Sequence, residues 1–282
     1  MSTPAQRWAD PSLLILPAFV LLILLFAVPL VWFFVGVLAE EGSWSSLAER
    51  FVDVLSSRGV TSALVTTNWI SALVTALTLV IGYPIAYYLA NNTGWRFALV
   101  LFCIIVPYFT SVIVRTYSWM VLLGRNGAVN QALLATGLIE TPLPLLYNKL
   151  GVLIGMTYVL LPYMVLTLYA TMRGIDSNLM RAAYGLGASR AYTFRKIYFP
   201  LSLHGVISGS LIVFILAIGF FITPALMGNP SDVMIAMLIE RSVEITLDWT
   251  GAAIMSLALL AMTLVLYIIY YRVTDVRRMM GA

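Results

Sequence analysis

Long runs of apolar residues alternate with short polar segments along the chain. A bilayer core of about 30 Å is crossed by about 20 helical residues. Apolar runs of that length predict six membrane-spanning helices, at about 12–38, 64–90, 97–123, 150–171, 203–227 and 250–271. The first run exceeds the apolar centre of a secretory signal and has no clear small-x-small cleavage site, so it is interpreted as a span. No linker separates the runs, and residues 1–282 are therefore predicted to form a single all-α integral membrane domain.

The composition supports this prediction. Of the 282 residues, 61% are hydrophobic and 10% are charged, and the mean hydropathy is +0.97. Soluble domains average about 45–50% apolar and about 25% charged residues, so this chain is expected to expose much of its apolar surface to lipid. The lone cysteine, Cys103, excludes an internal disulfide and a cysteine metal cluster, and no metal site is expected.

Lysine and arginine residues are distributed unequally between the two sides of the predicted spans, and an excess of them marks cytoplasmic loops. The side that holds both termini and the loop 172–202 carries ten: Arg7, Arg96, Arg173, Arg181, Arg190, Arg195, Lys196, Arg272, Arg277 and Arg278. The opposite side carries five: Arg50, Arg58, Arg125, Lys149 and Arg241. Both termini are therefore predicted to be cytoplasmic. Since the basic residues follow the topology and do not gather on one soluble face, no nucleic-acid partner is expected.

Small residues and prolines recur within the predicted spans. Two glycine pairs at a spacing of four would allow close approach between helices, although this pattern is too common to define a dimer face: Gly151 with Gly155, and Gly205 with Gly209. Four prolines predict kinks or cavity-lining turns: Pro84, Pro107, Pro162 and Pro224.

The loop 172–202 is a polar island with helix start and stop signals. Asp176 begins an N-cap region, and Gly187 suits the left-handed position that ends a helix. Between them, one narrow stripe carries apolar and small residues at helical spacing: Leu179, Ala182, Ala183 and Leu186. Such a stripe is typical of a helix that docks in a groove of another protein.

A second short helix is predicted to follow in this loop. Ser189 can cap it. Pro200 disfavours the helical conformation for Phe199, so the second helix is expected to end just before the next span.

These residues resemble the "EAA" loop of ABC importer permeases, whose pattern is Glu-Ala-Ala, three residues, Gly, nine residues, then Ile-x-Leu-Pro. Here Arg181 stands in place of the Glu and Phe199 in place of the Leu. The remaining pattern positions match at the required spacing: Ala182, Ala183, Gly187, Ile197 and Pro200. The chain is also similar to the spermidine/putrescine permease branch, in IVPYFTSVIVRTYSWM (105–120), PLLYN (144–148) and GFFITPALMG (219–228).

The resemblance implies a type I ABC importer permease fold, with cytoplasmic coupling helices between spans four and five. In that family the loop sits in a cleft of a cytoplasmic ATPase, and here the residues implied are Arg181, Ala182, Ala183, Gly187, Ala188, Ser189, Ile197 and Pro200. The charge contact usually made by the Glu is inverted at Arg181. We call residues 172–202 the coupling loop.

The resemblance also implies the partners. They are an ATPase dimer, a second homologous permease, a periplasmic solute-binding protein and the bilayer of a bacterial inner membrane. The implied function is to form half of an import pathway for a polyamine or related amine, or alternatively for an amino acid-like or phosphonate solute.

Catalytic motifs are absent from the sequence. A phosphate-binding P-loop needs Gly before Lys, whereas the lysines here, Lys149 and Lys196, follow Asn148 and Arg195. The single histidine excludes an HExxH zinc site, and no Gly-x-Ser-x-Gly elbow occurs. No catalytic residue and no cofactor of this chain is expected, and any ATP and Mg²⁺ would be bound by a partner ATPase.

Arg115 is the clearest ionisable group within a predicted span, where such groups cost roughly 2.5–3.5 kcal/mol on insertion scales. It is compatible with contact to an anionic substrate, with a pair to an external carboxylate such as Asp248 or Glu244, or with a lock on backbone carbonyls. Aromatic residues could bind ammonium groups by cation–π attraction, or simply pack. The candidate path residues are Tyr108, Arg115, Tyr117, Trp119, Phe220 and Thr223.

The alternative class is an ATP-independent carrier or channel. A proton-coupled carrier would need an acidic residue within a span, and inverted repeats are common in such folds. Neither is evident in the sequence.

Overall fold

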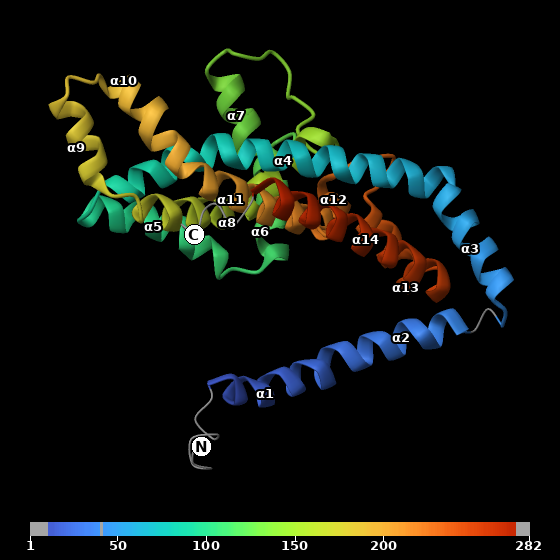
Figure 1. Cartoon of the computed structure of the whole chain (residues 1–282). Helices are drawn as coiled ribbons and strands as arrows, with labels where there is room; N and C mark the ends of the chain where they lie inside the picture. The colour runs from blue at the N-terminus through green and yellow to red at the C-terminus, as the bar shows by residue number, and fades with distance from the viewer. Residues whose placement is uncertain (1–10, 40–41, 275–282) are drawn as a thin grey trace, which may run out of the picture.

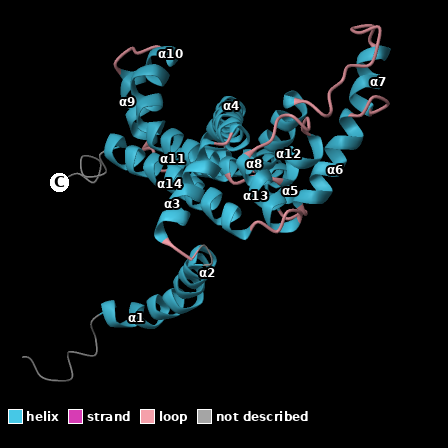
Figure 2. Cartoon of the chain, turned by 90° about the vertical axis from the view of Figure 1, so that its right-hand side faces the viewer, coloured by secondary structure: helices cyan, strands magenta, loops and turns pink. Residues whose placement is uncertain are grey.

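The computed structural model describes residues 11–39 and 42–274, and within them all regular structure is helical (Figures 1 and 2). The first half contains α1 (Pro11–Leu22), the π-helical turn η2 (Ile23–Ala27), α2 (Val28–Ala39), α3 (Trp44–Ser56), α4 (Arg58–Asn91), α5 (Trp95–Tyr108), α6 (Val112–Leu123) and α7 (Ala128–Ala135). The second half contains α8 (Lys149–Arg173), α9 (Ser177–Gly185), α10 (Arg190–Thr193), the π-helical turn η3 (Phe194–Tyr198), α11 (Phe199–Ile218), α12 (Ile222–Met227), α13 (Ile235–Glu244) and α14 (Trp249–Thr274).

Five helical segments in the described part of the chain are long and apolar enough to cross a membrane: Leu16–Ala39, Arg58–Asn91, Lys149–Arg173, Arg190–Ile218 and Trp249–Ile269. A bent pair of helices supplies a sixth crossing if it is counted as one. Six predicted spans therefore match five long helices and one broken one.

The third predicted span, 97–123, is not one straight helix. It breaks into α5 and α6, and the segments Trp95–Tyr108 and Val112–Ala135 meet at 105°. Pro107 lies in the last turn of α5, where its ring and missing N–H oppose continuation of the helix. The Thr110 hydroxyl donates to the Pro107 carbonyl at 2.7 Å and so satisfies one acceptor at the broken end. Hydropathy does not detect this bend, because the residues on both sides are apolar.

The fifth predicted span, 203–227, is wrong at both ends. α11 stops at Ile218, and α12 is a separate short helix after a break at 219–221. In the other direction, α10, η3 and α11 form one continuous helical segment from Arg190 to Ile218.

The expectation that Pro200 ends the preceding helix is therefore also wrong. Phe199 is helical, with φ −61° and ψ −48°, and its N–H donates to the carbonyl of Phe194, five residues earlier. The wider π-helical turn changes the hydrogen-bond register just before the proline. Pro200 then occupies the start of α11, where a missing N–H costs least.

The core lies where α4, α8 and α11 pack together (Figure 2). The largest buried side chains there include Ile70, Leu89, Met156, Leu160, Met164 and Leu168. Both glycine pairs are used within the chain. An added Cβ at Gly205 would lie 2.8 Å from Thr171 Cβ, and one at Gly155 would lie 2.6 Å from Thr223 Cγ2. The small-residue pattern therefore serves close packing of α8 against α11 and α12.

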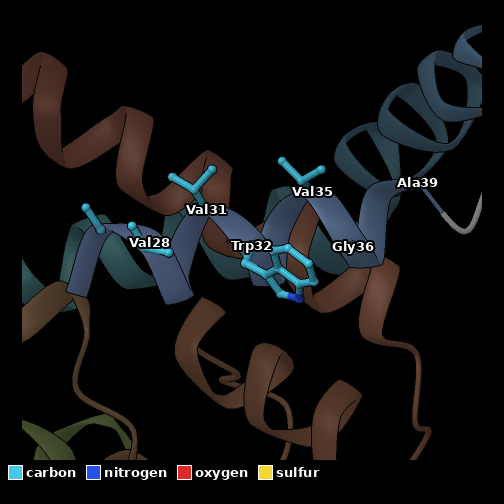
Figure 3. A pocket seen from close by; sticks show the side chains of 7 residues that line it. Val28, Val31, Trp32, Val35, Gly36 and Ala39 are labelled. Atoms are coloured by element: carbon cyan, nitrogen blue, oxygen red, sulfur yellow. The ribbon is translucent and has the colours of Figure 1, made fainter. Parts of the chain in front are cut away.

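The first span lies apart from this core. α1, η2 and α2 run along one line outside the bundle, and none of their described side chains is buried (Figure 1). The contact to α14 includes an edge-to-face pair of Phe33 and Trp249, with ring centroids 6.2 Å apart. Figure 3 shows side chains of an apolar groove on this segment, with the indole of Trp32 beside Gly36. Trp32 is 80% exposed, so this surface offers apolar contact and little polar chemistry.

Candidate coupling loop and translocation path

The coupling loop projects from one end of the bundle as two helical arms, α9 and α10 (Figures 1 and 2). The first arm begins where the sequence predicts. The Asp176 carboxylate accepts a hydrogen bond from the Asn178 N–H at 2.9 Å and so caps α9.

Gly187 makes the turn between the arms. Its φ is +85°, in the left-handed region. The Ala188 N–H donates to the Ala183 carbonyl and the Gly187 N–H to the Tyr184 carbonyl, each at 3.0 Å. These two bonds form a Schellman motif, which satisfies carbonyls at the end of α9. The predicted glycine turn is confirmed.

The second arm starts at a serine cap, as expected. The Ser189 hydroxyl accepts from the Tyr192 N–H at 3.3 Å. Most of the predicted loop residues lie with it around one open groove of about 730 Å³ between the arms, which we call the loop groove. Its lining is Leu179, Ala182, Ala183, Leu186, Gly187, Ala188, Ser189, Tyr192 and Ile197.

All four residues of the predicted apolar stripe line the loop groove, but their exposure differs. Ala183 is buried, whereas Leu186 is 90% exposed and Tyr192 is 57% exposed. Arg181 and Pro200 do not line the groove. Tyr192 was not singled out from the sequence, because nothing in its local pattern distinguishes it.

An aromatic cluster joins the second arm to α4, and we call it the aromatic hub. It consists of Tyr83 and Tyr87 on α4 with Phe194, Tyr198 and Phe199 on the continuous helix. The Tyr87 and Tyr198 ring centroids are 4.9 Å apart. Two side-chain hydrogen bonds complete it: Tyr83 Oη with Ser202 Oγ at 2.9 Å, and Asn91 Nδ2 donating to Tyr198 Oη at 3.2 Å. The base of the coupling loop is thus fixed to the bundle by side-chain packing.

The bend between α5 and α6 holds a second groove, the elbow groove, of about 430 Å³. It is lined by Val106, Pro107, Thr110, Val114, Arg115, Ser118, Trp119, Leu122 and Tyr158. Trp119 packs edge-on against Tyr158 of α8, with ring centroids 5.4 Å apart. Tyr158 was missed from the sequence, since it is distant in the chain and lies in an ordinary apolar run.

Arg115 is 8% exposed, and its buried Nε has no hydrogen-bond partner. The expected pair with Asp248 does not form: Asp248 instead accepts from Arg50 at 2.9 Å and from the Gly251 N–H at 2.9 Å. Among the described residues, no hydrogen bond or ion pair of the guanidinium is found, so a carbonyl lock is not formed either.

Four of the other path candidates lie outside the elbow groove. Thr223 is fully buried, and its hydroxyl lies 3.1 Å from that of Thr116. Phe220 packs against the main core. Tyr117 is 53% exposed on α6, and Tyr108 packs edge-on against Tyr163 with centroids 5.5 Å apart. Of the six candidates, only Arg115 and Trp119 line the elbow groove.

Two carboxylates lie one turn apart on α13, in a loop predicted to be external. Burial raises the pKa of Glu240 above its ordinary value, and the neighbouring Glu244 raises it further. In the described part of the chain, no cluster of three His, Cys, Asp or Glu side chains could hold a metal ion.

Comparison with known proteins identifies the family. The model of the "Binding-protein-dependent transport system inner membrane component" family matches residues 79–278. The spermidine/putrescine transport system permease protein PotB of Escherichia coli (strain K12) is 36% identical over 200 residues, which cover 71% of this chain and 73% of that protein. PotB of Haemophilus influenzae is 32% identical over 202 residues, covering 72% and 71%.

The fold has solved relatives. A chain from the crystal structure of a bacterial ABC transporter involved in import of the acidic polysaccharide alginate aligns with a TM-score of 0.68 at 16% identity, covering 94% of each chain. A chain from the structure of a bacterial alginate ABC transporter in complex with alginate pentasaccharide-bound periplasmic protein aligns with a TM-score of 0.69 at 16% identity. The resemblance to ABC importer permeases is therefore confirmed. The chain belongs to the family of binding-protein-dependent transport system inner membrane components, and it is a multi-pass transport subunit rather than an enzyme.

Proposed function

We propose that this permease subunit forms half of the pathway by which an ATP-driven importer moves a polyamine, such as spermidine or putrescine, or a related small amine. The observation that carries the substrate class is the identity of 36% over 200 residues to a spermidine/putrescine permease. The second half would come from a homologous permease subunit, and a periplasmic binding protein would deliver the solute.

The coupling loop would receive the motor subunits. The loop groove presents small and apolar side chains on a projecting turn, and Leu186 is 90% exposed, so none of the described residues covers it. A partner helix or cleft that covers Leu186 and Tyr192 would bury apolar area at roughly 25 cal/mol per Å². ATP and Mg²⁺ would be bound by an ATPase dimer and not by this chain.

Closure of the ATPases on ATP would move the coupling loops of the two permeases together. The aromatic hub fixes each loop to α4, and the continuous helix extends from the loop to Ile218. A displacement of the loop would therefore change the packing of the bundle and switch access from the cytoplasmic to the external side. In this proposal, both termini and the coupling loop lie in the cytoplasm.

The coupling role can be tested with one substitution at two neighbouring glycines. At Gly187 an added Cβ meets no atom within 4 Å, but φ is +85°, so valine there is strained by its backbone alone. The left-handed conformation costs an L-residue roughly 1–2 kcal/mol. At Gly185 the space is equally open and φ is not positive, so Gly185→Val is the matched control.

In proteoliposomes that contain the complete importer, we expect Gly187→Val to abolish spermidine uptake and to release the ATPase on purification. Gly185→Val should retain both, and both variants should insert in the membrane equally. Normal uptake by Gly187→Val would overturn the coupling role. ATP-independent uptake by the wild type would instead favour a carrier or channel, and competition by an amino acid or phosphonate but not by putrescine would replace the substrate class.

A further inference from the structure

The elbow groove contains a charge that this chain does not neutralise. Arg115 is more than nine-tenths buried, its Nε has no hydrogen-bond partner, and the groove that it lines is open on one side. A guanidinium stays protonated in a protein, so it cannot avoid the cost of burial by losing its charge. An unpaired buried charge is strongly destabilising, and the geometry calls for an anion.

Within the described residues, the two aspartates that form ion pairs do so with partners other than Arg115. Asp248 binds Arg50, and Asp232 lies 3.3 Å from Lys149. In the described part of the chain, neither Glu240 nor Glu244 on α13 forms an ion pair with Arg115. Among the residues that the structure describes, no carboxylate supplies the counter-charge, so a carboxylate of another chain would complete the site.

Two hydroxyls that line the groove, those of Thr110 and Ser118, already donate to backbone carbonyls and would not donate to a bound anion. Thr110 already donates to the Pro107 carbonyl at 2.7 Å, and Ser118 donates to the Val114 carbonyl at 2.8 Å. The Trp119 indole and the Tyr158 hydroxyl line the same groove without a hydrogen bond to another described residue. A carboxylate can accept two parallel hydrogen bonds from the planar guanidinium fork. The Trp119 indole N–H and the Tyr158 hydroxyl are further neutral donors in the same groove.

The surface around the groove favours a protein as the source of this carboxylate. Exposed apolar side chains on α6 lie in or beside the groove: Val114 at 59% and Leu122 at 40% line it, and the adjacent Val121 is 73% exposed. On a membrane-spanning helix such side chains face lipid or another membrane-spanning chain, and lipid tails carry no anion, so a carboxylate at this depth would come from a second membrane protein. A polyamine cargo is cationic and would be repelled, and cargo in any case leaves the site during each cycle.

We propose that the elbow groove receives an aspartate or glutamate side chain of the second permease subunit, which forms an intersubunit ion pair with Arg115. This inference rests on the proposed function, because it requires a second permease. The pair would hold the two permeases in register at the bend between α5 and α6.

The test is co-expression of the tagged chain with the second permease that the proposed function requires. Arg115→Met removes the charge at similar length, Arg115→Lys keeps the charge without the fork, and Arg125→Gln removes a neighbouring exposed arginine as a control. We expect Arg115→Met to reduce the co-purified second permease at least about tenfold, because it leaves the partner carboxylate buried and unpaired. Arg115→Lys should retain more of the pair, and Arg125→Gln should behave as the wild type.

Melting temperatures give a readout that general misfolding does not produce. Arg115→Met should raise the melting temperature of the chain expressed alone, since it removes an uncompensated buried charge, and should lower that of the pair. Equal co-purification, or lower melting temperatures in both states, would overturn the inference. So would a normal pair with a changed solute preference, which would place Arg115 in contact with cargo. Failure of the proposed function appears differently: the wild-type chain itself would purify without a second permease.

Discussion

Gly205 lies where α11 packs closely on α8, and its lack of a side chain permits that contact. A Cβ there would lie 2.8 Å from Thr171 Cβ and 3.0 Å from its Oγ1, and neither atom is the end of a long flexible side chain. Gly219, at the end of the same helix, has no atom within 4 Å of an added Cβ. The same substitution should therefore have different consequences at the two sites.

We predict that Gly205→Ala lowers the free energy of unfolding by about 1–3 kcal/mol, as overpacked cores do. Gly219→Ala should change it by less than about 0.5 kcal/mol. Thermal unfolding of the two purified variants in the same detergent measures the difference. Equal stability of both variants would show that α8 and α11 separate easily, contrary to their packing here.

Local hydrogen-bond chemistry explains which residues could be predicted from the sequence. Asp176, Gly187 and Ser189 were predicted correctly because a cap or a left-handed turn depends on a few neighbouring residues. The surroundings of Arg115 could not be predicted in this way. They depend on the contact of Trp119 with Tyr158, which only tertiary packing brings about.

At the scale of elements, the aromatic hub is the joint between the coupling loop and the bundle. Phe194 occupies its centre, with ring contacts to Tyr83, Tyr87 and Tyr198. It also begins the π-helical turn, a feature found frequently at functional sites. Loss of its ring would leave the coupling loop intact and weaken its attachment to α4.

We therefore predict that Phe194→Ala uncouples the importer. ATP hydrolysis by the assembled complex should remain within about twofold of wild type, while spermidine uptake falls by roughly tenfold, equivalent to about 1.4 kcal/mol. Phe102, which is 63% exposed on α5, supplies the matched control Phe102→Ala. If hydrolysis and uptake of the Phe194 variant fall in proportion, the hub stabilises the fold without transmitting motion.

The element boundaries show where hydropathy is and is not informative. It detected the apolar segments, because each must match the bilayer thickness. It did not detect the break at 109–111 or the one at 219–221, because both are flanked by equally apolar residues. The prediction that the helix ends before Pro200 is wrong for another reason. The π-helical turn changes the backbone hydrogen-bond register before the proline, so Phe199 stays helical.

At the scale of the whole molecule, the distribution of basic residues predicts one orientation in the membrane. α9 and α10 project at one end of the bundle (Figure 1). The basic residues of the coupling loop lie on these helices and on the adjoining η3: Arg181, Arg190, Arg195 and Lys196. The loop around Gly137 joins α7 to α8 and is predicted to lie on the opposite side of the membrane.

We predict that alkaline phosphatase, which is active only outside the cytoplasm, is active when fused after Gly137 and inactive when fused after Gly187. A cytoplasmic fluorescent reporter should give the reverse pattern. Activity of phosphatase at Gly187 would invert the topology and exclude a cytoplasmic motor at the coupling loop.

The continuous helix from Arg190 to Ile218 has 29 residues, roughly 40 Å at 1.5 Å per residue. Gly205 and Gly209 hold it against α8 near its middle. A stiff rod gripped at its midpoint swings its two ends in opposite directions. A stroke that draws the inner ends of two such rods inward would spread their outer ends, so one mouth of the passage would open as the other shuts.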